Sequence, residues 1–269
     1  MDSLRLSRIR KSIKERSRQM KAVLYIGHGT RSKKGAAEAN LFIGSVMKKV
    51  DAPIQKLCFL ELTEPDIEAG FEYCVQEGAA EIMIMPLFLL AAGHIKQDIP
   101  EELAPLIKKY PAITVRMADP FGVQDSILDA IAELAADDGE LIRSDDSILI
   151  VGRGSSDPSI LKSFDSIKRG ISRRLGVRNV QVCYLAAASP TFKDGLDSIC
   201  NEASGRVIVI PYLLFSGLLL SEVVREVNKK IKAGFSVNLT DTIGRHVAIQ
   251  NLVAEKANGE VYVNAAVIH

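Results

Sequence analysis

The stretch Val23-Leu-Tyr-Ile-Gly-His-Gly-Thr30 decides the fold, because the chain contains it a second time as Ile148-Leu-Ile-Val-Gly-Arg-Gly-Ser155. Each copy is an apolar run that ends in a glycine-rich turn, which is typical of a buried strand leading into a loop. The two copies lie 125 positions apart. This spacing predicts that the chain is built from two homologous halves.

The same shift superposes further landmarks. Cys58-Phe-Leu60 falls on Cys183-Tyr-Leu185, and Ile82-Met-Ile-Met-Pro86 falls on Val207-Ile-Val-Ile-Pro211. In both halves, apolar runs bounded by Gly and Pro alternate with helical patterns, which indicates βαβ units and a parallel sheet. We therefore expect an α/β protein with two tandem lobes, each a four-stranded, mainly parallel sheet flanked by helices.

The pattern also places the elements. Strands of the first lobe are expected near 22–27, 54–60, 81–87 and 112–117, with helices near 33–49, 65–77, 99–109 and 122–137. Pro65 is expected at the first helical position, where its missing N–H costs little. Strands of the second lobe are expected near 147–152, 179–185, 206–211 and 235–240.

The repeat divides the chain into segments. We expect a first lobe at 21–138, a linker at 139–146, a second lobe at 147–256 and a tail at 257–269. Residues 1–20 form a basic extension without the apolar core of a secretory signal. Three interpretations remain for it: a solvated helix or disordered arm, a transit peptide, or an upstream start with natural translation beginning at Met20.

Composition narrows the function classes. With 47% hydrophobic and 25% charged residues, the 269-residue chain is typical of globular proteins. A net charge of +1 predicts no general attraction to nucleic acid, and no apolar run has the ~18 residues that a membrane helix needs. The four cysteines form no CxxC motif, which argues against an iron–sulfur cluster and favours buried thiols in a reducing, cytoplasmic location.

Polar chemistry is confined to one half. Three potential metal ligands have no counterpart after the 125-residue shift: His28 (Arg153), Glu61 (Ala186) and His94 (Leu219). Each of the three follows a predicted strand, and open α/β sheets bind ligands at the carboxyl ends of their strands. Two imidazoles and a carboxylate suit Fe²⁺, Co²⁺, Ni²⁺ or Zn²⁺. The sequence thus predicts one divalent-metal site, although each residue taken alone could be structural or solvated.

Further side chains surround this predicted site. Glu64 is a second candidate carboxylate, with helix capping as the alternative. Basic residues gather at the same rim, where they predict either recognition of an anionic substrate or a solvated helix start: Arg31, Lys33, Lys34 and Lys96.

The second half supplies the opposite side of the predicted site. If the lobes face each other, Arg153 lies across the cleft from His28 and binds substrate carboxylates, with Ser155 beside it. Long apolar loops at 87–93 and 212–220 provide walls for a large flat ligand, beyond their part in core packing.

Four motifs carry a family resemblance: Tyr25-Ile-Gly-His-Gly-Thr30, Phe59-Leu-Glu-Leu-Thr-Glu-Pro65, Met85-Pro-Leu-Phe-Leu-Leu-Ala-Ala-Gly-His94 and Val151-Gly-Arg-Gly-Ser-Ser-Asp-Pro158. In order and spacing, they resemble the sirohydrochlorin chelatase family, class II chelatases that insert Fe²⁺ or Co²⁺ into sirohydrochlorin. The similarity runs from about Met20 to about His246. It is greatest to the two-lobed bacterial ferrochelatases of siroheme biosynthesis.

The resemblance implies two chelatase-like lobes with the active site in the cleft between them. It implies that His28, Glu61 and His94 are catalytic and that His28 and His94 hold the metal, while Arg153 is not a metal ligand in the family. Fe²⁺ is then a substrate, with Co²⁺ or Ni²⁺ as alternatives, and no permanently bound cofactor is expected. Because the second lobe supplies the far wall of the cleft, we expect a monomer to suffice.

Three alternatives stay open at this point. A cobaltochelatase uses the same ligands, but some such relatives carry a His-rich tail and a CxxC motif, and this chain has neither. The run of a strand followed by His28-Gly-Thr30 is superficially similar to the histidine phosphatases. Those enzymes have an Arg-His-Gly motif, and in this chain Gly27 stands in place of the arginine. A non-enzymatic metal-binding or metal-delivery protein would use the same histidine pair without converting a tetrapyrrole.

Overall fold

Strands and helices alternate along the computed structural model, which describes residues 21–91, 97–136, 139–259 and 266–267. The strands are β1 (Lys21–Gly27), β2 (Ile54–Phe59), β3 (Glu81–Pro86), β4 (Thr114–Met117), β5 (Ser147–Gly152), β6 (Asn179–Tyr184), β7 (Val207–Pro211), β8 (Val237–Leu239) and β9 (Ala266–Val267). The helices are α2 (Lys33–Met47), α3 (Ile67–Gln76), α5 (Asp98–Lys109), α6 (Asp125–Ala136), α7 (Pro158–Leu175), α8 (Phe192–Glu202), α9 (Leu218–Lys232), the 3₁₀ turn η1 (Ile243–Arg245) and α10 (Val247–Asn258).

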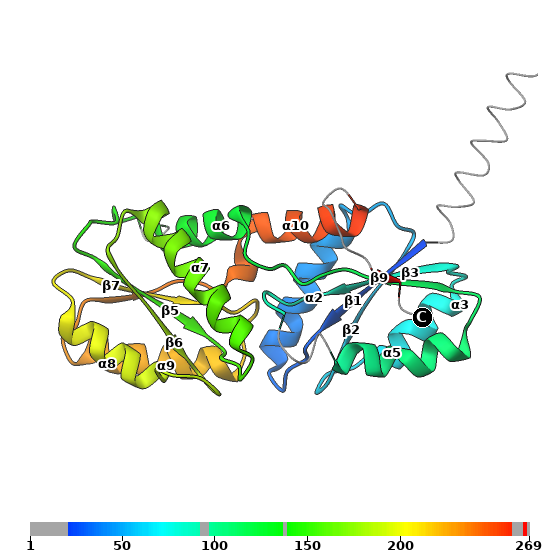
Figure 1. Ribbon diagram of the computed structural model, residues 1–269, viewed down its shortest axis with the longest axis horizontal. Helices are drawn as coiled ribbons and strands as arrows, with labels where there is room; N and C mark the ends of the chain where they lie inside the picture. Colours follow the sequence, from blue (N-terminus) through cyan, green and yellow to red (C-terminus); the bar gives the residue numbers. More distant parts are fainter. Residues whose placement is uncertain (1–20, 92–96, 137–138, 260–265, 268–269) are drawn as a thin grey trace, which may run out of the picture.

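Two sheets form the two lobes seen in Figure 1. The first has the strand order β2-β1-β3-β4-β9, and the second has the order β6-β5-β7-β8. All neighbouring strands are parallel except β9, which pairs antiparallel with β4. The expected pair of four-stranded parallel sheets is confirmed, and the C-terminal segment adds a short fifth strand to the first sheet.

The register brings the ends of three strands together. Ile26 of β1 lies opposite Cys58 of β2 on one side and Pro86 of β3 on the other. Because these strands run parallel, the loops that follow them leave the sheet at the same edge. The loops that carry the predicted site residues therefore follow the ends of neighbouring strands.

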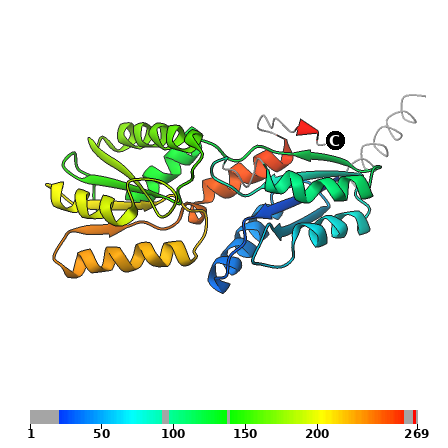
Figure 2. The ribbon, with the colours of Figure 1, turned by 60° about the horizontal axis from the view of Figure 1, so that its bottom comes forward.

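Two helices cross between the lobes. Helix α6, from the first half of the chain, packs against α7 and β7 of the second lobe, and α10, from the second half, packs against α2 of the first lobe. Figures 1 and 2 show α10 reaching from the second lobe to lie along the first. In space, each lobe is thus contacted by a helix from the other half, although the repeat boundaries expected from the sequence follow chain order.

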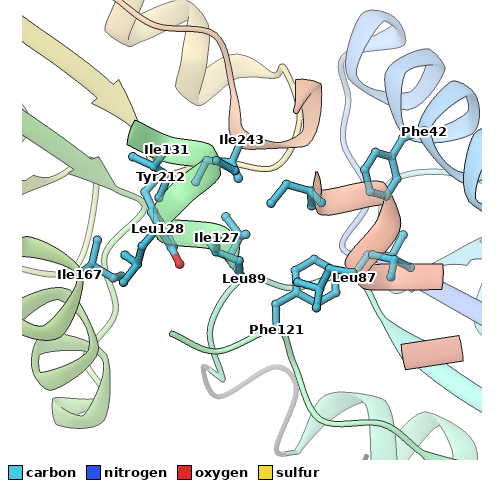
Figure 3. Close-up of a cluster of buried hydrophobic side chains, with 14 of the residues drawn as sticks. Phe42, Leu87, Leu89, Phe121, Ile127, Leu128, Ile131, Ile167, Tyr212 and Ile243 are labelled. Atoms are coloured by element: carbon cyan, nitrogen blue, oxygen red, sulfur yellow. The ribbon is translucent and has the colours of Figure 1, made fainter. Parts of the chain in front are cut away.

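A continuous apolar core runs through this exchange. One cluster of buried side chains includes Tyr25 of β1, Ile131 of α6 and Ile150 of β5. Figure 3 shows this region, with Phe42 and Leu87 from the first lobe near one end and Tyr212 near the other. Burial of apolar surface stabilises the folded state by roughly 25 cal/mol per Å². Because this cluster contains residues of both halves, its burial stabilises the two lobes together.

One helix start differs from its expected position. Helix α3 begins at Ile67, with Asp66 as the N-cap accepting from the backbone N–H of Ala69 at 2.8 Å. Pro65 lies before the helix, and its carbonyl accepts from the N–H of Phe59 at 2.9 Å. Pro65 is therefore part of the turn that joins β2 to α3, and the prediction that it is the first helical residue was wrong.

The cysteines are buried, as the sequence predicted. All four cysteines are buried free thiols, and burial raises the pKa of Cys74 and Cys183 to about 12. Within the part of the chain that the structure describes, no helix has the length and apolar character needed to cross a membrane.

Candidate active site

The loops after β1 and β2 are joined by backbone hydrogen bonds. The N–H of Leu60 donates to the carbonyl of Gly27 at 2.9 Å, and the N–H of Glu61 donates to the carbonyl of His28 at 3.0 Å. Gly29 follows with a φ of +94°, and a Cβ built on it would lie 1.6 Å from the carbonyl oxygen of Glu61. Only glycine fits there, so this turn fixes His28 beside Glu61.

The second half builds the same turn with different side chains. The N–H of Ala186 donates to the carbonyl of Arg153 at 2.8 Å. Gly154 has a φ of +89°, and its Cβ would lie 1.7 Å from the carbonyl oxygen of Ala186. The scaffold is thus duplicated, and the imidazole and carboxylate are replaced by a guanidinium and a methyl group.

His28 has a partner on each side of its ring. Its Nδ1 lies 3.2 Å from Oε1 of Glu61, and its Nε2 lies 2.9 Å from Nη1 of Arg153. A guanidinium only donates hydrogen bonds, so Nε2 accepts and Nδ1 carries the proton that faces Glu61. This is the neutral Nδ1–H tautomer, and a carboxylate that holds the second nitrogen is the usual support of a metal-binding histidine.

The Arg153 contact joins the two lobes at equivalent positions of the repeat. His28 and Arg153 are separated by 125 residues, which is the repeat shift itself. The expectation that Arg153 lies across the cleft from His28 is confirmed by this contact. The side chain of His28 is 26% exposed and that of Glu61 is 49% exposed, so both remain accessible to a ligand.

Two cavities open between the lobes and meet at Arg153. The first has a volume of about 530 Å³ and is lined by His28, Arg31 and Glu61 together with the loop Leu213–Leu220. The second has a volume of about 490 Å³. Arg153 and Ala186 line both cavities. Each volume is within the usual range of small-molecule sites.

The repeat shift relates the two cavities. Thr30 lines the first and its equivalent Ser155 lines the second, and Leu87 is matched in the same way by Tyr212. The apolar rim is exchanged between lobes, since Leu213–Leu220 of the second lobe borders the first cavity and Phe88–Leu90 of the first lobe borders the second. Among the described lining residues, only the first cavity contains an imidazole and a glutamate.

Glu38 anchors the rim of the first cavity. Its carboxylate accepts from the backbone N–H of Ser216 at 2.8 Å, from the Ser216 hydroxyl at 2.9 Å and from Arg245 at 3.3 Å. Burial opposes ionisation, but the Ser216 hydrogen bonds and the charge of Arg245 hold the pKa of Glu38 below its usual value. This link ties the loop of the second lobe to helix α2 of the first.

The remaining predicted residues fall in different places. Arg31 is exposed and lines the first cavity, whereas Ser155 lines the second and its hydroxyl accepts from the N–H of Asp157 at 3.1 Å. Lys33 is the exposed first residue of α2 and is not among the described lining residues. His94 and Lys96 lie outside the described residues, so their predicted roles stay predictions.

Glu64, the second candidate carboxylate, serves the backbone. It accepts from the N–H of Asp66 at 3.2 Å and does not line either cavity among the described residues. In the described part of the chain, no group of three or more His, Cys, Asp or Glu side chains is arranged to hold a metal ion.

Two aromatic residues of the apolar loops predicted as cavity walls lie at the site, although neither was singled out from the sequence. The ring of Phe88 lies 6.1 Å from that of His28, centroid to centroid. Tyr212 is buried in the wall of the second cavity, its hydroxyl has no hydrogen-bond partner among the described residues, and burial raises its pKa. The signal was present in the repeat, where Tyr212 adds a hydroxyl at the position of Leu87.

Comparisons with known proteins agree over most of the chain. The CbiX family matches residues 22–138 and again residues 147–260. A sirohydrochlorin ferrochelatase of Priestia megaterium is 40% identical over 88% of this chain and 89% of its own length, and a sirohydrochlorin cobaltochelatase of the same organism is 29% identical over 91% and 83%. The solved structure of SirB from Bacillus subtilis with Fe³⁺ has a TM-score of 0.80 at 35% identity, covering 89% of this chain and 96% of that one.

Proposed function

Because the chain belongs to the CbiX family, we propose that it is a sirohydrochlorin ferrochelatase, which inserts Fe²⁺ into sirohydrochlorin to make siroheme. The ferrochelatase relative is 40% identical to this chain and the cobaltochelatase relative 29%. The observation in the structure that carries the proposal is the His28–Glu61 pair on the wall of the first cavity, in contact with Arg153, which lines both cavities. A tetrapyrrole needs a large cleft with one metal-handling group at its centre.

His28 supplies the group that handles the metal. With its proton on Nδ1 and facing Glu61, the ring presents Nε2 as its donor to a divalent ion. Glu61 fixes the ring orientation and the tautomer. His94, which the family resemblance pairs with His28, is expected to be the second imidazole.

Proton transfer follows from charge balance. Sirohydrochlorin loses two pyrrole protons when a divalent ion enters, so the site needs acceptors close to the macrocycle. Glu61 is a half-exposed carboxylate on the cavity wall and can accept a proton directly. It can also accept through His28, if Nε2 takes a proton and Nδ1 passes one to the carboxylate.

Substrate recognition is assigned to the positive and polar groups around the cavities. Sirohydrochlorin carries eight carboxylates, and guanidinium groups bind carboxylates with two parallel hydrogen bonds. Arg31 lines the first cavity, Ser155 the second and Arg153 both, which supports their assignment to substrate binding. Lys33 and Lys96 remain expected contributors at the rim. We further expect one chain to suffice and the reaction to take place in the cytoplasm.

An anaerobic absorbance time course tests the proposal. Purified protein is mixed with sirohydrochlorin and Fe²⁺, and we expect protein-dependent conversion to the metallated ring. His28→Asn should abolish this conversion. The matched control is His246→Asn, because His246 also pairs with a glutamate, Glu133 at 2.9 Å, and lies outside both cavities. Asparagine keeps a capping group for the N-terminus of α10, so this variant should retain its rate.

The same assay separates the alternative functions. A faster rate with Co²⁺ than with Fe²⁺ would favour the cobaltochelatase, for which the cobaltochelatase relative is the supporting observation. Metal binding without conversion of sirohydrochlorin by the wild-type protein would favour a metal-delivery protein. Equal loss of activity in both asparagine variants would contradict the assignment of the site to His28.

A further inference from the structure

Arg153 donates a hydrogen bond to Nε2 of His28, the ring nitrogen that a metal ion would bind. Since Nδ1 carries the proton that faces Glu61, a metal can bond this tautomer only through the lone pair of Nε2. Nη1 of Arg153 lies 2.9 Å from that atom. A metal–imidazole bond of about 2.0–2.1 Å uses the same lone pair and the same direction. The guanidinium and the metal therefore exclude each other at Nε2.

Arg153 is also placed to bind something else. It is exposed, lines both cavities, and forms no ion pair with an acidic side chain of the described residues. A neutral imidazole offers the guanidinium one lone pair and no charge. A carboxylate offers two oxygens and a negative charge in the planar geometry that arginine matches. A carboxylate that enters either cavity therefore competes with His28 for Arg153.

We propose that Arg153 is a positioning residue that covers Nε2 of His28 until a carboxylate-bearing ligand draws it away. With the ligand bound, the lone pair of Nε2 becomes available to the metal. The identity of the ligand rests on the proposed function, which makes it sirohydrochlorin. The consequence is an order of binding in which the tetrapyrrole precedes the metal at His28.

A cobalt titration without tetrapyrrole tests whether Arg153 covers Nε2 of His28, referred to below as the cover. Co²⁺ binding is followed by visible absorbance for the wild type, Arg153→Ala, His28→Ala and the double variant. If Arg153 covers Nε2 for about nine-tenths of the time, its removal strengthens Co²⁺ binding about tenfold. The gain should disappear in the His28→Ala background, because no imidazole is left to uncover. No gain in Arg153→Ala would overturn the proposal.

A general charge effect is separated by two controls. Arg31→Ala removes the same charge from the wall of the first cavity, and Co²⁺ affinity should stay within about twofold of the wild type. If instead Arg153→Ala strengthens Co²⁺ binding equally with and without His28, repulsion between cations explains the gain and the cover is refuted. Arg153 is exposed, so the variant is expected to fold.

Sirohydrochlorin added without metal tests the release. In the wild type, the ¹⁵N signal of His28 Nε2 should move on sirohydrochlorin binding towards its position in Arg153→Ala. A signal that does not move while sirohydrochlorin binds would refute the release. Arg153→Ala should also raise the KM for sirohydrochlorin while it lowers the Kd for Co²⁺, and a purely structural role predicts no such opposite pair of changes.

The outcomes distinguish this inference from the proposed function. The cobalt titrations contain no tetrapyrrole, so they decide the cover even if the protein is not a chelatase. A wild-type protein that fails to bind sirohydrochlorin refutes the proposed function and the tetrapyrrole-driven release together. A protein that inserts iron but gives the same Co²⁺ affinity for the wild type and Arg153→Ala keeps the proposed function and loses the cover.

Discussion

At the scale of single residues, the site depends on a glycine as much as on its polar groups. Gly29 lets the backbone turn so closely over Glu61 that no Cβ fits, and this turn sets His28 and Glu61 side by side. Gly154 does the same in the second half, where the polar pair is absent. The turn is therefore a feature of the scaffold, and the chemistry is added by the side chains it carries.

Glu61→Gln should lower the kcat of iron insertion about 10–100-fold, because the variant cannot accept a proton and can donate to Nδ1, which favours the wrong tautomer of His28. Steady-state kinetics with Fe²⁺ measure the change. The control is Glu64→Gln, which removes a nearby carboxylate that serves the backbone of Asp66. Similar losses in the two variants would argue against a specific role for Glu61.

Gly29→Ala should destabilise the fold by about 2 kcal/mol more than Gly78→Ala, since steric overlap is added to the cost of a positive φ. Gly78 has a φ of +89° but no atom within 4 Å of a built Cβ, so its variant has only the conformational cost. Urea unfolding of both variants gives the comparison. Equal stabilities would mean that the backbone around Glu61 yields easily.

The sequence predicted these residues unevenly, for a physical reason. His28, Glu61 and Arg153 stand out because the repeat supplies an internal comparison, and the order of parallel strands brings their loops to one edge. The contact of Arg153 with Nε2 was not predicted, because it depends on how two lobes are placed relative to each other. No local pattern encodes that placement.

At the scale of elements, helices α3 and α8 approach their sheets through the same pair of small residues. A Cβ on Gly70 would lie 2.7 Å from the Cβ of Cys58, and one on Gly195 would lie 2.6 Å from the Cβ of Cys183. The two pairs are equivalent in the repeat. The two strand cysteines that were predicted to be core thiols thus each pack closely against a helix glycine.

Gly70→Ala and Gly195→Ala should each destabilise the protein by about 1–2 kcal/mol, since overpacking exceeds the gain in helix propensity. Gly44→Ala, in helix α2, is the control. No atom lies within 4 Å of a Cβ built at Gly44, so this change should stabilise by about 0.5–1 kcal/mol. Chemical denaturation measures all three, and stabilisation by every one would contradict the close contact.

Helix positions were predictable to within a few residues, and helix partners were not. The apolar stripe of a helix shows that one face is buried but does not say against which sheet. Helices α6 and α10 could each have covered the sheet of their own half, and chain order favours that assignment. Their exchange between lobes depends on the path of the linker and on the shared core, which only the three-dimensional structure shows.

At the scale of the whole molecule, the exchanged helices make the lobes depend on each other. The core cluster that contains Tyr25 and Ile150 passes through α6 and α10 without interruption. If one half unfolded, the other would lose the helix that packs against it and part of the shared core. Stability should therefore be a property of the entire chain.

Calorimetry of the full chain should show one unfolding transition. Gly70→Ala in the first lobe and Gly195→Ala in the second should each lower the midpoint of that same transition, because a cooperative unit responds as a whole. Ellipticity and tyrosine fluorescence should give coincident curves. Two separate transitions, each shifted by only one of the variants, would show that the lobes unfold independently.

The contact between His28 and Arg153 has a consequence for how such a protein can arise. A residue that touches its own repeat equivalent lies on the axis relating the two halves, as a residue does at the centre of a twofold homodimer. In a homodimer both copies must be identical, so a histidine there could only face a histidine. Joining the halves in one chain removes that constraint. Broken symmetry at a single pair of positions is what allows one half to hold the reactive group and the other to control access to it.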